Sequence, residues 1–439
     1  MSNFYRFLQI SMTPIVRTFF GEIKTNNYDK LPIGEPIIFV ANHPSALMDP
    51  LICGAFVEKP IYFLGRADIF KSKFNNWFLR NSHMWPIYRD VDGKDSLEKN
   101  KQVFAECYES LKNGNPILLY GEGFTDESFI RRIKKIKKGA SRIAFGAEEA
   151  FDFELGLSIV PLGINYTNSE KKDSDLMLNF GEPVKLKDYE SQFKDNAVKA
   201  MLEVTREVET RLLSLVTHID DKKEADDLEN TLSLFDDSVH QTTKESQVPV
   251  VERWKKSKKI ADALNDWEGE EKETFKTRLN DFAKKHYSGE STVFVNRAIE
   301  GKPVPNIEWI LLFFTWPVAL IGFLLNGLSF YLVQTLPKKL VKRKCFYSGM
   351  KVAFTLIVAP LVWLIDYFIL MPFVDISPLF PLIVGVGLFT ALFALRYRTT
   401  WKRFQLKVQA KKHVKSLKDL KSELKELEDL RLIIENKLK

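Results

Sequence analysis

A histidine and an aspartate stand close together in the segment 42–50 (NHPSALMDP), which directly follows the short apolar run 36–41 (PIIFVA). Five residues separate His43 from Asp49. A histidine can remove a proton from a hydroxyl group at neutral pH, and a carboxylate bonded to its other ring nitrogen fixes the tautomer and stabilises the protonated ring. The pair is therefore a candidate general base with its orienting acid. Taken alone, the same pattern is also typical of a loop histidine beside a capping aspartate.

Two later segments carry residues suited to an anionic ligand. Arg89 follows another short apolar run, and its guanidinium group could bind a phosphate through two N–H groups. The next apolar run (PILLY) leads directly into Gly121-Glu122-Gly123, and Thr125 follows. The two glycines allow backbone amides to approach an anion closely.

Downstream of these glycines lies the basic run 131–138 (RRIKKIKK), followed by the run 158–162 (SIVPL). The basic run is most simply a solvated helix end or a face that contacts a membrane. The second run reads as a strand that ends at the edge of the same site. Candidate chemistry is thus spread over the segment from residue 36 to residue 162.

Taken in this order, the motifs resemble those of the glycerolipid acyltransferase family, which includes the lysophosphatidate and glycerol-3-phosphate acyltransferases. The resemblance covers residues 36 to about 190. The residues that match the four motifs of the family in order are His43 with Asp49, Arg89, Glu122 with Gly123, and Pro161. The resemblance implies an α/β acyltransferase fold in which His43 activates a glycerol hydroxyl to attack the thioester of acyl-CoA or acyl carrier protein. It also implies that Arg89 and the third motif hold the phosphate of the acceptor, and that no cofactor or metal is required.

The chain departs from the family pattern in two places. The spacing between His43 and Asp49 is one residue longer, and the arginine that usually follows Glu-Gly in the third motif is missing. Phosphate binding would then rest on Arg89, on backbone amides, or on Lys137. Both departures resemble a branch of fungal-type acyltransferases with a long membrane-embedded C-terminal extension. The resemblance therefore implies glycerol-3-phosphate as the acceptor, with lysophosphatidate as the alternative.

Short apolar runs alternate with helical patterns between residues 36 and 190, which predicts an α/β domain whose sheet is covered on its faces. The predicted strands are 36–41, 61–64, 116–120, 158–162 and 176–180, and the predicted helices are 97–112 and 140–150. On this basis the sequence divides into an amphipathic helix (1–24), the acyltransferase domain (25–190), a charged helical extension and linker (191–300), a membrane domain (301–400) and a helical tail (401–439). The helix 1–24 could lie in a membrane interface or pack on the domain. The polar stretch 219–247 reads as a loose, solvated linker.

Three apolar segments, 309–337, 352–374 and 376–395, are long enough to enter a membrane, so we expect an integral membrane protein. Basic residues after the first and the third segment favour the cytoplasmic side for both places, which conflicts with three simple spans and a cytoplasmic catalytic domain. A hairpin in the first segment, broken at Pro317 and Asn326-Gly327, would remove the conflict. The other two segments would then form one spanning hairpin that turns at Asp375.

Composition limits the remaining function classes. The 439 residues include 64 Lys and Arg against 57 Asp and Glu, a formal charge of +7 that is too small to indicate nucleic-acid binding but fits an anionic membrane surface. Three cysteines without paired spacing exclude a disulfide framework and a zinc cluster. Leucines in the tail predict a short coiled coil, which could pair two chains, or a helix docked on its own chain. A non-catalytic membrane scaffold is the alternative of another class.

Overall fold

The computed structural model describes residues 3–32, 34–57, 59–89, 93, 95–287, 292–370 and 380–439. The chain divides into two compact units, which are described separately. The first unit comprises residues 1–17, 23–170 and 176–218, and the second comprises residues 18–22, 171–175 and 219–439.

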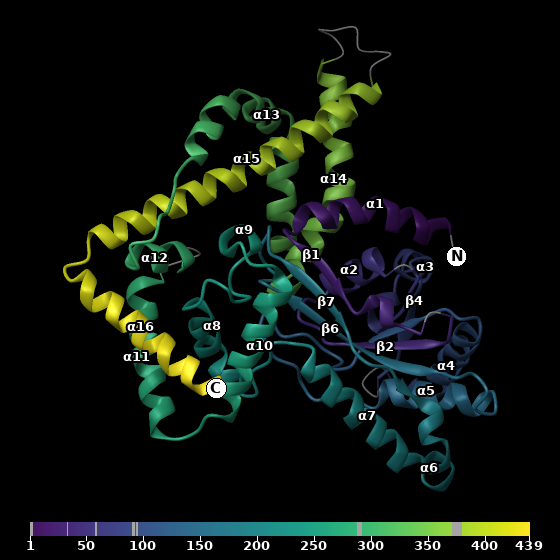
Figure 1. Ribbon diagram of the computed structural model, residues 1–439. Coiled ribbons are helices and arrows are strands. Elements are labelled where there is room, and N and C mark those ends of the chain that lie inside the picture. Colours follow the sequence, from purple (N-terminus) through teal and green to yellow (C-terminus); the bar gives the residue numbers. More distant parts are fainter. Residues whose placement is uncertain are drawn as a thin grey trace. The chain divides into compact units, whose positions relative to one another are not determined.

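A single twisted sheet organises the first unit (Figure 1). Its strands are β1 (Ile23–Asn26), β2 (Ile37–Ala41), β3 (Tyr62–Arg66), β4 (Met84–Ile87), β5 (Ile117–Tyr120), β6 (Ser158–Tyr166), β7 (Leu176–Phe180) and β8 (Val184–Lys185). The strand order is β1-β7-β6-β2-β5-β3-β4, and β8 pairs with β6. Strands β6, β2, β5, β3 and β4 run parallel to one another, so their carboxyl ends meet at one edge. Parallel sheets place ligand sites at that edge.

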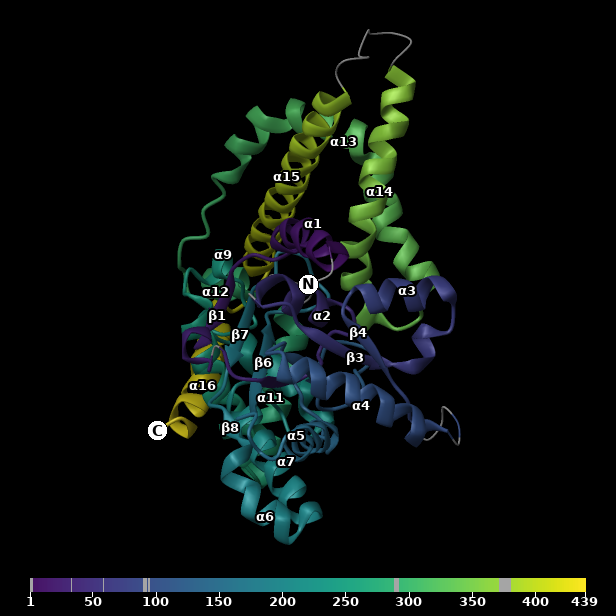
Figure 2. The same cartoon turned by 90° about the vertical axis from the view of Figure 1, so that its right-hand side faces the viewer.

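Helices cover both faces of this sheet, as expected for a mostly parallel sheet with apolar strands. Figure 2 shows α1 and α2 on the opposite side of the sheet from α4, α5 and α7. The helices of this unit are α1 (Asn3–Phe19), α2 (Met48–Phe56), α3 (Lys73–Asn81), α4 (Ser96–Lys112), α5 (Gly139–Ala150), α6 (Glu190–Asp195) and α7 (Ala197–Ser214). The buried core between α4, α5, α7 and the sheet includes Val40, Cys107, Phe145 and Val208. The predicted α/β fold is confirmed.

Strand β6 and the first unit both end later than expected from the sequence. Strand β6 continues to Tyr166 instead of ending at residue 162. The first unit extends to His218 instead of ending at residue 190, because the apolar face of α7 completes the core on one side of the sheet. The run 131–138 is not helical; α5 begins only at Gly139.

Helices make up the body of the second unit. They are α8 (Ala225–Ser233), α9 (Thr243–Ser246), α10 (Val250–Asp266), α11 (Glu270–His286), α12 (Thr292–Ile299), α13 (Glu308–Leu340), α14 (Tyr347–Leu370), α15 (Phe380–Lys415) and α16 (Leu420–Lys437). Helix α16 packs into this body and buries Leu427, Leu430 and Ile434, so the docked helix is the arrangement found for the tail. A pairing of two chains through the tail stays a prediction.

The stretch 219–247 is not a loose linker. It contains α8 and α9, and it buries Leu228, Leu232, Phe235 and Val239 at 3% exposure or less. These four side chains belong to the same core as α10, α11, α12 and α16. Although most residues of this stretch are polar or charged, its few apolar side chains are enough to pack it into the core.

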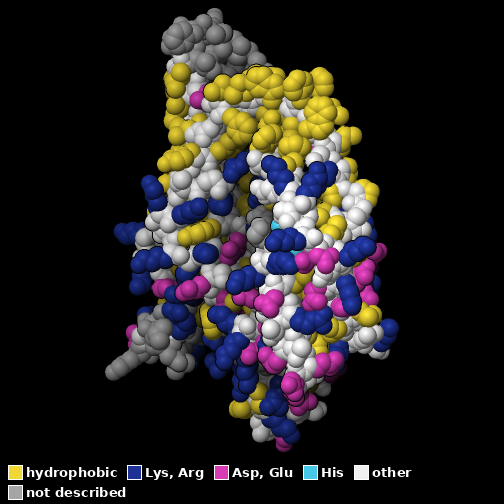
Figure 3. Space-filling view, turned by 90° about the vertical axis from the view of Figure 1, so that its left-hand side faces the viewer, with side chains coloured by type: hydrophobic (Ala, Val, Ile, Leu, Met, Phe, Trp, Pro, Cys, Tyr) yellow, Lys and Arg dark blue, Asp and Glu magenta, His cyan; other side chains and the backbone are white. Residues whose placement is uncertain are grey.

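Helices α13, α14 and α15 pack against one another, and the first two are long and apolar enough to cross a membrane by length and composition. Figure 3 shows a band of hydrophobic side chains where these helices lie, bordered by Lys and Arg. The predicted break in the first apolar segment is wrong: α13 is one continuous helix through Pro317 and Asn326, which Figures 1 and 2 show as bent. The predicted turn at Asp375 lies outside the described residues.

Candidate active site

Three parallel strands bring the candidate catalytic residues to one edge of the sheet. Strand β2 ends at Ala41 and leads into His43, strand β5 ends at Tyr120 and leads into Glu122, and strand β6 lies beside β2. Because β2 lies between β5 and β6, residues that follow β2 can contact residues of both neighbours. The carboxyl edge of the sheet is therefore the place where distant parts of the sequence meet.

Two side chains fix the backbone at His43. The amide of Asn42 pairs twice with the backbone of Ile164, donating to its carbonyl (3.0 Å) and accepting from its N–H (2.7 Å). The Glu122 carboxylate accepts the backbone N–H of His43 (2.7 Å) and that of Lys134 (3.0 Å). The Asn42 side chain thus continues the ladder between β2 and β6 after β2 has ended, and Glu122 ties the next residue to the loop that follows β5.

The predicted dyad is in hydrogen-bonding contact. His43 Nδ1 lies 2.7 Å from Oδ2 of Asp49, which occupies the first turn of α2. The same Oδ2 atom accepts the backbone N–H of Ser45 (2.9 Å), and Oδ1 accepts the hydroxyl of Tyr166 (2.6 Å). Asp49 is 0% exposed, and burial raises its pKa, while the hydrogen bonds from His43 and Tyr166 act in the opposite direction. The longer spacing in the first motif is therefore compatible with the contact.

The imidazole of His43 stacks on the ring of Tyr120, with centroids 3.8 Å apart and planes 12° from parallel. The His43 side chain is 14% exposed. Since Nδ1 is engaged by Asp49, Nε2 is the nitrogen that could meet a substrate hydroxyl.

The glycine-containing turn after β5 has a lysine beside it. Gly123 has a φ of 75°, and a Cβ built on it would lie 2.9 Å from Nζ of Lys137. Lys137 is exposed, and its backbone N–H donates to the carbonyl of Gly121 (2.9 Å). Thr125 is 5% exposed and therefore buried. A small residue at position 123 therefore leaves room for the lysine ammonium group beside the turn.

Arg89 follows a strand that is adjacent to neither β2 nor β5. It is exposed and follows β4, the edge strand, which lies three strands from β2 in the sheet order. It nevertheless lies at the same carboxyl edge as His43, because β4 is parallel to β3 and the central strands. The sequence assigned His43, Glu122 and Arg89 to one site; the structure joins the first two directly.

Residues 22–165 match the protein-family model described as Acyltransferase. This segment is an acyltransferase domain. No curated protein matches the chain. Among solved structures, the 1-acyl-sn-glycerophosphate (LPA) acyltransferase PlsC from Thermotoga maritima matches with 21% sequence identity over 47% of this chain and 78% of its own, at a TM-score of 0.34. The match to the Acyltransferase model confirms, for this segment, the family predicted from the motifs.

The basic run of the acyltransferase domain is not uniformly solvated. Arg131 is 7% exposed and donates to the backbone carbonyls of Tyr166 (2.5 Å) and Thr167 (2.6 Å). Lys134 pairs with Asp126 at 3.0 Å and lies over the ring of Phe124. The expectation of a solvated run is therefore wrong for Arg131, whose role is to hold the end of β6.

Three other reactive side chains of the first unit are buried. His83 is 4% exposed between the rings of Tyr5 and Tyr62, and burial lowers its pKa to about 4. Burial raises the pKa of the Cys53 and Cys107 thiols, which keeps them protonated and weakly nucleophilic. Among the described residues, no group of three or more His, Cys, Asp or Glu side chains could hold a metal ion.

Sequence reasoning missed Tyr120 and Tyr166 of the acyltransferase domain, and it did not assign the role of Asn42. Tyr120 is the last residue of the PILLY run, so a strand ending beside the first motif was a usable signal. Tyr166 had no comparable signal, since its strand was expected to end four residues earlier. The pairing of Asn42 with Ile164 depends on the alignment of β2 with β6, which spacing alone does not reveal.

Proposed function

We propose that the protein is a membrane-bound O-acyltransferase that transfers a fatty acyl group from an acyl thioester to the sn-1 hydroxyl of glycerol-3-phosphate in phospholipid biosynthesis. The observation that carries the proposal is the contact between His43 and Asp49 at the carboxyl edge of the sheet, inside the segment that matches the acyltransferase model. Acyl-CoA or acyl carrier protein would supply the thioester.

In the proposed mechanism, Nε2 of His43 accepts the proton of the acceptor hydroxyl as its oxygen attacks the thioester carbonyl. The C–O bond forms, the tetrahedral intermediate collapses, and the C–S bond breaks. The protonated ring then returns its proton to the leaving thiolate. The Asp49 carboxylate stabilises the protonated ring throughout. The step needs no covalent enzyme intermediate, which agrees with the buried, protonated state of Cys53 and Cys107.

For the acceptor phosphate we propose the backbone amides around Gly123, the ammonium group of Lys137 and the guanidinium group of Arg89. The first two lie together in the turn after β5. A free glycerol-3-phosphate is favoured over its lysolipid product because the motif departures and the apolar C-terminal helices resemble the branch that uses this acceptor.

We further propose that α13 and α14 anchor the protein in a phospholipid membrane and that the acyltransferase domain is cytoplasmic. Both helices are long and apolar enough to cross a membrane, and Lys338, Lys339, Lys342 and Arg343 at their junction favour the cytoplasmic side there. For the acyltransferase domain to share that side, the bent helix α13 would enter the membrane and return without crossing it, while α14 crosses. Labelling of a cysteine introduced at Lys342 should occur from the same side as the catalytic domain. The three native cysteines are buried and should stay unlabelled.

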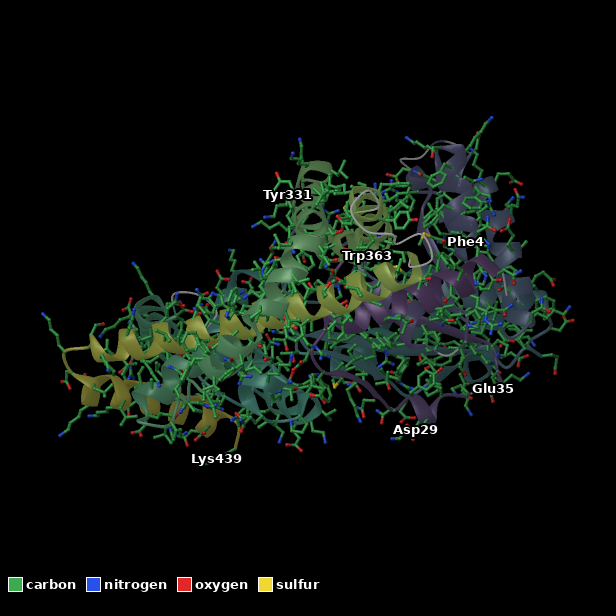
Figure 4. All side chains as sticks on the ribbon, turned by 90° about the horizontal axis from the view of Figure 1, so that it is seen from above. Phe4, Asp29, Glu35, Tyr331, Trp363 and Lys439 are labelled. Atoms are coloured by element: carbon green, nitrogen blue, oxygen red, sulfur yellow. The ribbon has the colours of Figure 1, made fainter. Side chains whose placement is uncertain are left out.

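An aromatic surface on the acyltransferase domain supports direct contact with lipid. Phe7 and Ile10 of α1 and Phe74 and Trp77 of α3 are each more than half exposed. The ring of Phe4 contacts Trp77 at 5.2 Å, so α1 and α3 present one continuous surface (Figure 4 labels Phe4). Exposed aromatic and aliphatic side chains on adjoining helices are typical of a membrane-interface surface.

The test is acyl transfer in membranes that contain the full chain, with a labelled acyl thioester and either glycerol-3-phosphate or lysophosphatidate. His43→Ala should abolish product, whereas His240→Ala, which removes a partly exposed histidine of the second unit, should not. Product from lysophosphatidate alone would keep the mechanism and replace the acceptor. No product from either acceptor in membranes that hold folded protein would contradict the proposal.

A further inference from the structure

The buried Asp49 carboxylate is bonded to three groups from two separate parts of the chain. Oδ2 is hydrogen-bonded to Nδ1 of His43 and accepts the backbone N–H of Ser45, and Oδ1 accepts the Tyr166 hydroxyl at 2.6 Å. A carboxylate removed from water stays ionised only if hydrogen bonds or charges replace its hydration. Tyr166 is thus the side chain that replaces water at the oxygen facing away from the histidine.

Tyr166 is itself held rigidly at the end of β6. Its side chain is 2% exposed, and its ring meets that of Phe129 edge to face. Its backbone carbonyl accepts a hydrogen bond from the buried Arg131. The preceding part of β6 is locked to β2 through the double pairing of Asn42 with Ile164. The hydroxyl therefore has little freedom to leave the carboxylate.

We propose that Tyr166 is a positioning residue that keeps Asp49 ionised and oriented toward His43, and so sets the pH at which the dyad becomes active. This inference rests on the proposed function, in which His43 is the base. Tyr166 does not touch the reacting atoms; it acts through Asp49. When His43 is neutral, the Asp49 charge is balanced chiefly by hydrogen bonds, so the Tyr166 bond matters more in that state than when the ring is protonated.

Other titratable groups face the dyad and have to remain unchanged in the test. Cys53 lies on α2 with Asp49, and Tyr120 lies on β5 against the imidazole. Glu122 follows β5 and is bonded to the backbone of His43 and of Lys134. Burial raises the pKa of Cys53 and of Tyr120, so both are neutral around pH 7, and Glu122 is the other acidic group in direct contact with His43.

The experiment compares Tyr166→Phe with the wild-type full chain in membranes. Phenylalanine keeps the ring and removes only the hydroxyl, so we expect the sheet edge to stay intact. Turnover should fall about tenfold with little change in the KM of either substrate. The acidic limb of the pH profile should move upward by about half a pH unit. Without the Tyr166 hydroxyl, the Asp49 carboxylate depends more on the protonated His43 ring, so the ring keeps its proton to higher pH. Tyr287→Phe, which removes a buried hydroxyl bonded to Asn296 in the second unit, should shift neither.

A second readout separates this inference from the proposed function. The rate at which diethyl pyrocarbonate modifies His43, followed by mass spectrometry across pH, reports protonation of the dyad without turnover. A midpoint that moves upward in Tyr166→Phe supports the inference even if no acceptor gives product, in which case the proposed function alone fails. Identical midpoints and identical pH profiles in the variant and the wild type would overturn the role of Tyr166.

Discussion

Replacing Glu122 with glutamine should lower turnover without weakening acceptor binding, because this carboxylate contacts the protein backbone. The sequence motif suggests a substrate ligand, yet Glu122 is 3% exposed and its two oxygens accept the N–H groups of His43 and Lys134. Glutamine keeps one acceptor oxygen and turns an NH2 group toward the other N–H. One of the two backbone donors is then left facing a donor.

The magnitude follows from the loss of one hydrogen bond to a charged group, which is worth about 1.5–3 kcal/mol. If the strain is expressed at the backbone of His43, the same free energy corresponds to a decrease in turnover of roughly 10- to 150-fold. If it is expressed mainly at Lys134, the loss appears as lower stability of the acyltransferase domain. The increase in activation free energy and the decrease in unfolding free energy should together equal the free energy of the lost hydrogen bond.

The assay measures turnover and KM with varied acceptor, together with the thermal midpoint of the full chain in detergent. We expect a lower kcat, an acceptor KM within about twofold of wild type, and a reduced midpoint. Glu98→Gln, which alters an exposed carboxylate on α4, is the matched control and should change none of these. A large rise in acceptor KM with unchanged kcat would refute the reasoning and return Glu122 to the role of a substrate ligand.

Three further predictions concern other parts of the chain. Burial lowers the pKa of His83 to about 4, so below about pH 6.5 the unfolded chain binds a proton at this residue that the folded chain does not bind. The free energy of unfolding should therefore fall by about 2–3 kcal/mol as the pH drops from 6.5 to 4. In denaturant titrations at several pH values, His83→Asn, which tolerates the φ of 58°, should flatten this dependence. Arg253 is 0% exposed and pairs with the buried Asp175, so Arg253→Met should cost about 3–5 kcal/mol in the same titrations, whereas Lys194→Met at an exposed pair should cost less than about 1 kcal/mol. Trp77→Ser should weaken the binding of vesicles by a chain truncated before α13, provided circular dichroism shows the truncated chain to be folded; binding equal to that of the unaltered truncated chain would contradict the membrane-surface proposal.

The dyad could be predicted from the sequence because its members are near neighbours in the chain. His43 and Asp49 lie on the connection between β2 and α2, and any α/β domain with these elements brings them to a sheet edge. The functions of Asn42 and Glu122 depend instead on which strands lie beside β2. That arrangement is set by packing between segments more than 70 residues apart, as the contacts of His43 with Glu122 and of Asn42 with Ile164 show.

The end of β6 shows why Tyr166 could not be predicted. Gly163 and Asn165 interrupt the apolar pattern and read as the end of a strand. In the structure, a Cβ at Gly163 would lie 2.7 Å from the carbonyl of Leu215, and the amide of Asn165 donates to that same carbonyl. The glycine and the asparagine therefore fit the end of α7 against the strand, and the strand continues to Tyr166.

The prediction for α13 was wrong for the same reason: residues that are typical of turns are held within the helix by tertiary contacts. Asn326-Gly327 and Pro317 are turn residues in water, but here the Asn326 side chain donates to the carbonyl of Gly322 and to the Thr390 hydroxyl, and it accepts the indole N–H of Trp363, labelled in Figure 4. Gly322 allows close approach, since a Cβ there would lie 2.4 Å from the backbone of Thr390. In an apolar surrounding, polar and small residues of this kind hold neighbouring helices together. Proline removes only one backbone donor, which bends a helix without ending it.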